Sequence, residues 1–295
     1  MIKYQLMHAK SMLVGSPDEW FRSGWNLNTY RGCEHACNYC YARSHKYLIH
    51  STEEAFDRTI FVKINAPQVL RRELEKLSKK GKKGIICFNS ASDPYQPCEV
   101  KYKISRKVLG VIKDYHFPCH IMMKSDLILR DLDLLREVSE RAWCTVSFTI
   151  TTFELAELLE PKAPEPERRL NAMKKLSEEG VSTGILLMPI IPYLTDNKEN
   201  IEEIVERGAE SGAEYVIPGE MTLRDAQKER FMKLLEETFP ELVEKYEALY
   251  KNSIPGEEYR SKVTEIIKSV CHKHKMPMRI PEPRIKRYVQ SELLP

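Results

Sequence analysis

Apolar and polar positions along the chain predict short strands that alternate with helices. Six short segments are apolar or β-branched and are bounded by polar turns, which is typical of strands buried in a parallel sheet. The segments between them place apolar residues three and four positions apart, as in helices that pack one face on a sheet. The predicted strands are 25–30, 84–89, 119–124, 144–150, 183–188 and 214–217, and the predicted helices are 67–79, 105–115, 131–141, 167–179 and 198–211.

This order of elements predicts an α/β fold: a partial (β/α)6 barrel of the TIM type with a C-terminal helical extension. Parallel strands need crossover connections, and six β-then-α units are fewer than the eight that close a full barrel. A further β-like segment at 59–65 lies in the insertion between the first two strands, and we expect it outside the main sheet. Charged helices are predicted at 224–237, 240–251 and 259–275. The predicted divisions are an N-terminal extension at 1–22, the barrel at 23–220, and C-terminal helices with a basic tail at 221–295.

The composition excludes two classes of protein. Apolar residues make up 42% of the 295 residues and charged residues 30%, which does not fit a disordered chain. The longest apolar stretch, 184–194, is interrupted by two prolines and is shorter than the roughly 20 residues of a membrane helix. The first residues do not form a secretory signal, so we expect a cytoplasmic protein whose cysteines are reduced or bound to metal.

Charge adds little about partners except at the C-terminus. Lys and Arg total 46 against 43 Asp and Glu, and the resulting net charge of +3 points to no partner class. The segment 261–295 is locally basic, so an anionic partner is expected there first. Asn and Gln are scarce beside abundant Lys and Glu, a composition reported for proteins of thermophiles.

The strongest chemical signal is the segment 32–41 (GCEHACNYCY), directly after the first predicted strand. Cys33, Cys37 and Cys40 have the spacing C-x3-C-x2-C. A structural zinc site takes four ligands in C-x2-4-C pairs, so zinc would need His35 or a distant cysteine as well. An iron–sulfur cubane held by three cysteines leaves one iron open to a ligand that is not protein. The position after a barrel strand, where barrel active sites lie, favours the cubane over zinc and over three unligated thiols.

With three other motifs, this loop resembles the signature of radical S-adenosylmethionine (radical SAM) enzymes. The four segments together resemble the spore photoproduct lyase-like group, often labelled DNA repair photolyase. The resemblance implies a 4Fe-4S cluster on the three cysteines and S-adenosylmethionine (AdoMet) on its open iron. It also implies cleavage of AdoMet to methionine and a 5′-deoxyadenosyl radical that abstracts hydrogen from a substrate. The segments are 28–43 (NTYRGCEHACNYCYAR), 90–99 (SASDPYQPCE), 124–135 (KSDLILRDLDLL) and 188–196 (MPIIPYLTD).

The resemblance also implies which residues hold AdoMet. Ser92 and Asp93 follow the second strand, where the family binds the ammonium group, and a carboxylate suits that cation. Lys124 ends the third strand and would neutralise the methionine carboxylate. Asp93 could instead begin an Asp-Pro turn, and Lys124 could simply solvate a strand end.

Four further residues would surround the nucleoside part of AdoMet. Ser147 and Thr149 lie two positions apart on the fourth strand, so they share a face from which they would reach the ribose hydroxyls. Tyr39 would lie near the adenine, and Pro189 would offer it an apolar wall. All four are also plausible core residues.

The hydrogen donor departs from the family pattern. Spore photoproduct lyases carry a donor cysteine three residues before the aspartate matched by Asp93, and Ser90 occupies that place here. A hydroxyl is a far poorer hydrogen-atom donor than a thiol. Cys87 and Cys98 are the candidate substitutes if they face the cavity, and Tyr95 is a candidate radical relay. Each could also be a core residue.

The substrate stays open between several classes. A nucleic-acid base would have to be flipped into the barrel mouth, where Tyr41, Tyr95 and Tyr193 are candidates to stack on it. The same chemistry on a peptide or small metabolite is an alternative, and a non-catalytic iron–sulfur module is the alternative outside enzymes. The expected partners are AdoMet and an electron donor such as ferredoxin or flavodoxin.

Overall fold

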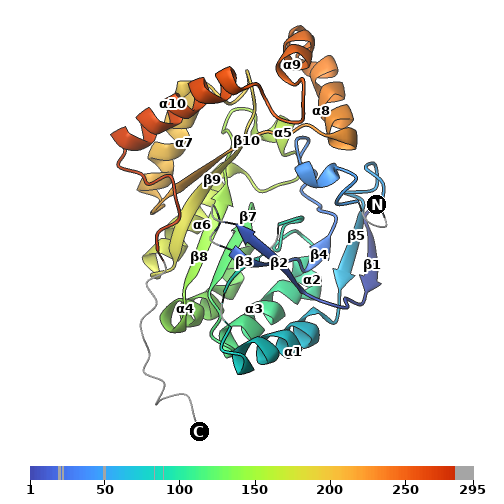
Figure 1. The fold of residues 1–295 in the computed structure, drawn as a ribbon, viewed down its shortest axis with the longest axis vertical. Helices are drawn as coiled ribbons and strands as arrows, with labels where there is room; N and C mark the ends of the chain where they lie inside the picture. The colour runs from blue at the N-terminus through green and yellow to red at the C-terminus, as the bar shows by residue number, and fades with distance from the viewer. Residues whose placement is uncertain (19–20, 22, 49–50, 83, 89, 283–295) are drawn as a thin grey trace.

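A seven-stranded sheet forms the centre of the part of the chain described by the computed structural model, residues 1–18, 21, 23–48, 51–82, 84–88 and 90–282 (Figure 1). Six strands run parallel in chain order, and an antiparallel strand borders the first of them. The predicted partial (β/α)6 barrel is therefore confirmed. From one edge to the other, the strands are β10 (Val216–Glu220), β9 (Ser182–Ile190), β8 (Cys144–Thr149), β7 (Cys119–Met123), β6 (Ile85–Phe88), β3 (Ser23–Leu27) and β2 (Leu13–Asp18).

Helices link successive parallel strands and cover the outer face of the sheet, as the apolar spacing predicts (Figure 1). Their bounds lie close to the predicted ones. The main helices are α1 (Ala66–Lys79), α3 (Ile104–Asp114), α4 (Leu132–Arg141), α6 (Pro166–Glu178) and α7 (Lys198–Glu210), with short α2 (Glu99–Tyr102) and α5 (Ala156–Leu159) in the loops; the C-terminal helices are α8 (Asp225–Thr238), α9 (Val243–Leu249) and α10 (Glu257–Lys273).

A second, three-stranded sheet flanks the barrel. Its strands are β1 (Lys3–Met7), β5 (Thr59–Lys63) and β4 (Tyr30–Arg31). The β-like segment 59–65 thus lies outside the main sheet, as predicted. The N-terminal segment 1–22 contributes β1 and β2 to the two sheets, which the sequence analysis did not foresee, because β1 is half-exposed and lacks an apolar run.

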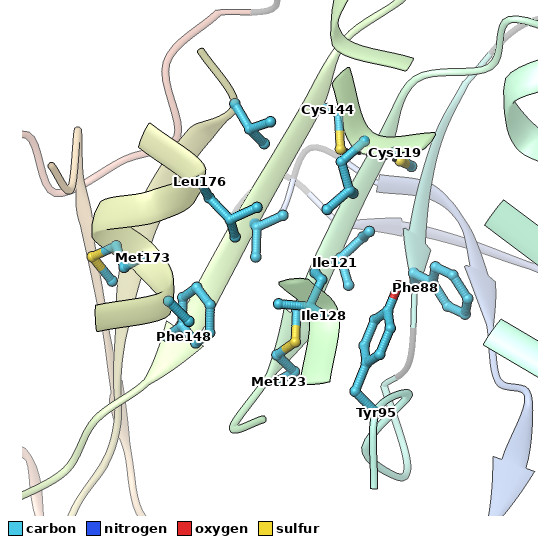
Figure 2. Packing of buried hydrophobic residues seen from close by; sticks show 14 of the residues in the cluster. Phe88, Tyr95, Cys119, Ile121, Met123, Ile128, Cys144, Phe148, Met173 and Leu176 are labelled. Atoms are coloured by element: carbon cyan, nitrogen blue, oxygen red, sulfur yellow. Dashed lines mark hydrogen bonds between the residues drawn. The ribbon is translucent and has the colours of Figure 1, made fainter. Parts of the chain in front are cut away.

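The two faces of the main sheet differ in chemistry. On the outer face, residues such as Phe88, Ile121 and Phe148 pack with helix residues in the largest core cluster (Figure 2). The inner face carries a smaller apolar cluster that includes Met122 and Leu186. Successive strand residues point to opposite faces, so polar residues that alternate with the outer core lie in the barrel lumen.

Two further expectations concern a membrane-spanning helix and the C-terminal tail. No helix in the described ranges is long and apolar enough to cross a membrane. The last part of the predicted basic tail, 283–295, lies outside the described residues.

We expect the lumen to be sensitive to a single added methyl group at Gly184 on β9. A Cβ at this position would lie 2.3 Å from the ring carbons of Tyr215, so the ring would have to move. Gly184→Ala should lower the free energy of unfolding by about 1–3 kcal/mol, the usual cost of overpacking. Urea denaturation monitored by circular dichroism measures this change.

Gly110→Ala in α3 is the matched control. An added Cβ there meets nothing within 4 Å, and Ala is a better helix former than Gly by about 0.5–1 kcal/mol. This variant should be as stable as the parent or more so. Equal stability losses in the two variants would contradict the packing argument.

Candidate active site

The cysteine loop leaves β4 through a backbone turn that requires glycine. Gly32 has φ +74, and a Cβ on it would lie 2.6 Å from the carbonyl oxygen of Thr59. The Cys33 N–H then donates to the Phe56 carbonyl at 3.2 Å, and Ala36 turns the chain again with φ 57. Both turns fold the loop back over the end of the barrel.

Two of the three cysteines of the loop, Cys33 and Cys37, are in an environment that favours the thiol over the thiolate. Cys33 and Cys37 are buried, and Cys40 is partly exposed. Burial raises the pKa of Cys37 to about 12 even though the positive charge of Lys124 opposes the shift, and burial raises the pKa of Cys33 well above its usual range. Cationic iron would supply the charge that thiolates need here.

The donor set does not suit a single metal ion. Within the described residues, no three His, Cys, Asp or Glu side chains converge closely enough to hold one. A zinc ion needs four donors about 2.0–2.3 Å from one point. All eight cysteines lie in the described ranges and none is in a disulfide, so no disulfide removes the loop cysteines from a cluster.

Residues far away in the sequence hold the loop in place. Gln96 accepts from the Glu34 N–H at 2.9 Å and donates to the Gly32 carbonyl at 3.1 Å. The Asn38 N–H donates to the Leu159 carbonyl at 2.9 Å. These contacts tie the loop to the segments that follow β6 and β8.

Two buried side chains, Arg43 and Gln227, also hold the cysteine loop in place. Arg43 is fully buried, donates to the Cys37 carbonyl at 3.2 Å and pairs with Asp57 at 3.2 Å. From α8, Gln227 donates to the Tyr39 carbonyl at 3.0 Å. The C-terminal extension therefore contributes directly to the position of the loop.

A buried charge cluster lies next to Cys37. Glu160 is 3% exposed and contacts the Arg169 guanidinium and the Tyr39 hydroxyl, which donates to it. Lys124 Nζ lies 4.0 Å from Glu160 Oε1 and 5.6 Å from the centre of the Tyr39 ring. Burial alone would raise the pKa of Glu160, but the positive charges of Arg169 and Lys124 hold it below its ordinary value.

Asp93 joins the ends of two neighbouring strands. Its carboxylate accepts the Tyr95 N–H at 2.8 Å and the Lys124 N–H at 2.7 Å, and His35 Nε2 lies 3.4 Å away. Burial would raise its pKa, but His35 and the two amides outweigh burial and lower it. The contact with Tyr95 is the Asp-Pro turn that the sequence offered as an alternative. Nearby, the Ser92 hydroxyl donates to the Tyr30 carbonyl at 3.2 Å.

The three predicted catalytic residues lie in two different places in the structure. Cys87 lies on the lumen face of β6, with its Sγ 4.0 Å from His120 Nδ1. Tyr95 and Cys98 instead lie in the outer core cluster, and Figure 2 shows Tyr95 beside Phe88. The Tyr95 hydroxyl donates to Asp131 at 3.1 Å. Cys98 was a candidate donor only if it faced the cavity, and Tyr95 could instead pack in a turn; both lie in the core, because the loop after β6 turns outward.

The predicted nucleoside contacts occupy different depths of the barrel. Ser147 is fully buried and its hydroxyl already contacts His120 and Tyr215, whereas Thr149 ends β8 nearer the cysteine loop. Pro189 lies near the end of β9 after a cis peptide bond.

Of the three tyrosines considered for base stacking, two are available at the surface. Tyr41 is 45% exposed and Tyr193 is 43% exposed. Tyr95 is fully buried and has no exposed face on which a base could stack, so the prediction that it could stack on a base was wrong.

Comparison with known proteins agrees with the motifs. The Radical SAM superfamily profile matches residues 27–208, which is more than half of the chain. The chain belongs to the radical SAM superfamily. Enzymes of this superfamily use a 4Fe-4S cluster and AdoMet, so these are the cofactors of this chain. The superfamily assignment drawn from the four motifs is thereby confirmed.

Relatives of this radical SAM protein occur in bacteria, archaea and a virus. An uncharacterized protein of Mycobacterium tuberculosis is 30% identical over 85% of this chain and 75% of its own length. One of Methanocaldococcus jannaschii is 34% identical over 66% of this chain and 71% of its own length. One of Acidianus two-tailed virus is 32% identical over 67% of each chain.

Solved structures show the same fold. A spore photoproduct lyase with bound AdoMet and dinucleoside spore photoproduct has a TM-score of 0.72, with 13% identity over 92% of this chain and 79% of that one. A complex of spore photoproduct lyase with the dinucleoside spore photoproduct alone has a TM-score of 0.71, with 13% identity and the same coverage of both chains. At this identity the likeness establishes the fold of the radical SAM chain.

The sequence analysis missed several residues of this radical SAM site. Glu160 and Arg169 belong to none of the four motifs. Arg169 shares a face of α6 with the buried Met173 and Leu176, so a charge at a core-facing helical position was the available signal. Gln96 and Gln227 act through contacts distant in sequence, for which no local pattern exists, whereas Arg43 lies in the first motif and contacts Cys37 six positions earlier.

We expect Arg169→Ala to destabilise the radical SAM fold strongly. Removing one partner of a buried ion pair leaves an uncompensated charge, which costs about 3–5 kcal/mol of unfolding free energy. Arg168→Ala, one position earlier in α6, removes only the exposed pair with Asp126 and should cost about 0–1 kcal/mol. Urea denaturation of both variants measures the difference, and similar losses would contradict the role given to the buried pair.

Proposed function

We propose that Cys33, Cys37 and Cys40 ligate the 4Fe-4S cluster and that the fourth iron site binds AdoMet. The grouping of these three cysteines on one loop over the barrel mouth, beside the partly buried cation Lys124, carries this proposal. When bound, the two cofactors supply one-electron cleavage of AdoMet to methionine and a 5′-deoxyadenosyl radical. An electron-transfer protein such as ferredoxin or flavodoxin provides the electron.

The residues around the cysteine loop would bind the polar ends of AdoMet. Lys124 offers a partly buried cation for the methionine carboxylate. Each Asp93 oxygen accepts one backbone N–H, and a carboxylate has about four acceptor positions, so Asp93 keeps capacity for the ammonium group. Ser92 lies beside Asp93. Thr149 and Pro189, with Tyr39, would surround the ribose and adenine; Ser147 lies deeper, and its hydroxyl is already engaged by His120 and Tyr215.

We expect Cys37→Ala to abolish cluster binding. After anaerobic reconstitution with iron and sulfide, the parent should bind about four iron atoms and, once reduced, convert AdoMet to 5′-deoxyadenosine. The variant should lose both properties because it lacks a ligand. Iron analysis, visible absorption and chromatography measure these changes.

Cys271→Ala is the matched control, because this cysteine is also buried but lies in α10 away from the loop. It should retain iron and cleavage. Unchanged iron in Cys37→Ala would refute the ligand assignment. A parent that binds the cluster but yields no 5′-deoxyadenosine would favour the non-catalytic module.

For the substrate we propose a nucleic-acid base, with Cys87 rather than Ser90 as the hydrogen donor. Support comes from the fold shared with spore photoproduct lyase and from the exposed rings of Tyr41 and Tyr193. Lys245 Nζ lies 5.8 Å from the centre of the Tyr193 ring, so an aromatic face and a cation lie together. Because Ser90 replaces the donor cysteine of the family, we propose a reaction other than spore photoproduct repair.

Binding of a single-stranded oligodeoxynucleotide tests this substrate class. The logarithm of affinity should fall linearly with that of salt concentration, by about 0.7 per phosphate contacted. Tyr193→Ala should weaken binding because base stacking contributes about 1–3 kcal/mol. Val14→Ala, an exposed apolar position on β2, should leave affinity unchanged. If the affinity for the oligodeoxynucleotide changes neither with salt concentration nor in Tyr193→Ala, a peptide or small metabolite is favoured as the substrate.

A further inference from the structure

A row of polar side chains crosses the lumen from β6 to the floor of the barrel. Cys87 Sγ lies 4.0 Å from His120 Nδ1, and His120 Nε2 lies 2.8 Å from the Ser147 hydroxyl. The Ser147 hydroxyl lies 2.7 Å from the Tyr215 hydroxyl, which in turn lies 2.8 Å from Thr145 Oγ1. These five residues are buried, and none of them belongs to the four sequence motifs.

The row ends at the surface opposite the cysteine loop. Thr145 Oγ1 lies 3.1 Å from the Ser182 hydroxyl, which donates to the Glu214 carboxylate at 2.7 Å. Ser182 begins β9, and Glu214 is an exposed residue just before β10. The amino ends of parallel strands lie at one end of the barrel, so Glu214 meets water at the floor while the cysteine loop covers the mouth.

The donor and the acceptor in each of these hydrogen bonds can be assigned from the number of protons available. Each hydroxyl has one proton to donate. Ser182 gives its proton to Glu214, and the Thr145 proton points to Ser182, whose backbone carbonyl (3.2 Å) and hydroxyl (3.1 Å) both lie within reach, so Thr145 accepts from Tyr215.

The same count continues into the lumen. Because the Tyr215 proton points to Thr145, Ser147 donates to Tyr215, and His120 Nε2–H donates to Ser147. His120 Nδ1 is then the unprotonated nitrogen and faces the Cys87 thiol. Burial lowers the pKa of His120 to about 3, which agrees with a neutral ring that accepts at Nδ1.

We propose that this row is a proton path that connects the Cys87 thiol to water at Glu214, with His120 as the group that exchanges the proton with Cys87. The inference rests on the proposed function in one respect, namely that chemistry takes place at the lumen end of the path. AdoMet and substrate would close the mouth, so a route through the floor would keep Cys87 in protonic equilibrium with solvent.

The transfer involves protons only. The Cys87 S–H proton passes to His120 Nδ1 while the Nε2 proton passes to Ser147. Ser147, Tyr215, Thr145 and Ser182 each accept one proton and release one, and Glu214 receives the last. The reverse sequence returns a proton to Cys87. No bond between heavy atoms changes, and no electron is transferred.

The tautomer of His120 is the first test. Long-range ¹H–¹⁵N correlation spectra of the full-length protein labelled at histidine nitrogens should show His120 protonated at Nε2 only, with assignment by a His120→Gln variant. In Tyr215→Phe, Ser147 loses its acceptor and is free to donate to Nε2, so the Nδ1–H tautomer should become populated. An Nδ1–H tautomer or a cationic ring in the parent at neutral pH would overturn the proposal.

Hydrogen exchange of the thiol is the second test. The infrared S–H band of Cys87, identified by difference from Cys87→Ala, should convert to S–D after transfer to D₂O. Tyr215→Phe should slow this conversion about tenfold or more, because the path loses a link and each tenfold corresponds to about 1.4 kcal/mol of barrier. Ser147→Ala breaks the path at another point and should act similarly if Tyr215→Phe folds poorly.

Tyr246→Phe is the matched control, because it removes a buried tyrosine hydroxyl outside the lumen that donates to the Pro192 carbonyl. Its exchange rate and its His120 spectrum should equal those of the parent. Equal exchange rates in the parent, Tyr215→Phe and Ser147→Ala would overturn the path. Neither measurement needs AdoMet turnover, so failure of the proposed function would leave both results interpretable.

Discussion

Glu160 is a carboxylate with almost no contact with water, and its charge is compensated by Arg169, Lys124 and the Tyr39 hydroxyl. A buried charge without such partners would cost several kcal/mol, so the positions of these groups depend on one another. Tyr39 is part of the cysteine loop, and Lys124 directly follows β7. The ion pair therefore couples the loop to the barrel and sets the electrostatic environment of Cys37.

The same loop is tied to the C-terminal helices. Cys37 and Tyr39 belong to an apolar cluster with Phe231 of α8 and Tyr246 of α9, and Gln227 donates to the Tyr39 carbonyl. Although α8 and α9 follow the last barrel strand, they complete the surroundings of the cysteine loop.

The two faces of the sheet carry different kinds of residue: the outer face packs against helices, and the inner face carries polar residues that could take part in chemistry. Apolar residues of β6 to β9 point outward to the helices, and the residues that alternate with them supply Cys87, His120 and Ser147 to the lumen. This alternation explains why Cys87 is a lumen residue while Cys98, eleven positions later on a loop, is a core residue. Sequence reasoning could name both cysteines but could not follow the loop that turns Cys98 outward.

The sequence by itself determined the six parallel strands, the helices between them, the cysteine loop and the superfamily. These features depend on local periodicity and on motifs of adjacent residues, which can be read directly from the chain. Only the tertiary structure decided that Glu160 meets Arg169, that Gln227 of α8 holds the loop, and that Cys87 connects through His120 and Tyr215 to the barrel floor. Glu160 and Arg169 meet because the chain turns between α5 and α6, and the other contacts join residues that are distant along the chain and come together only in the folded barrel.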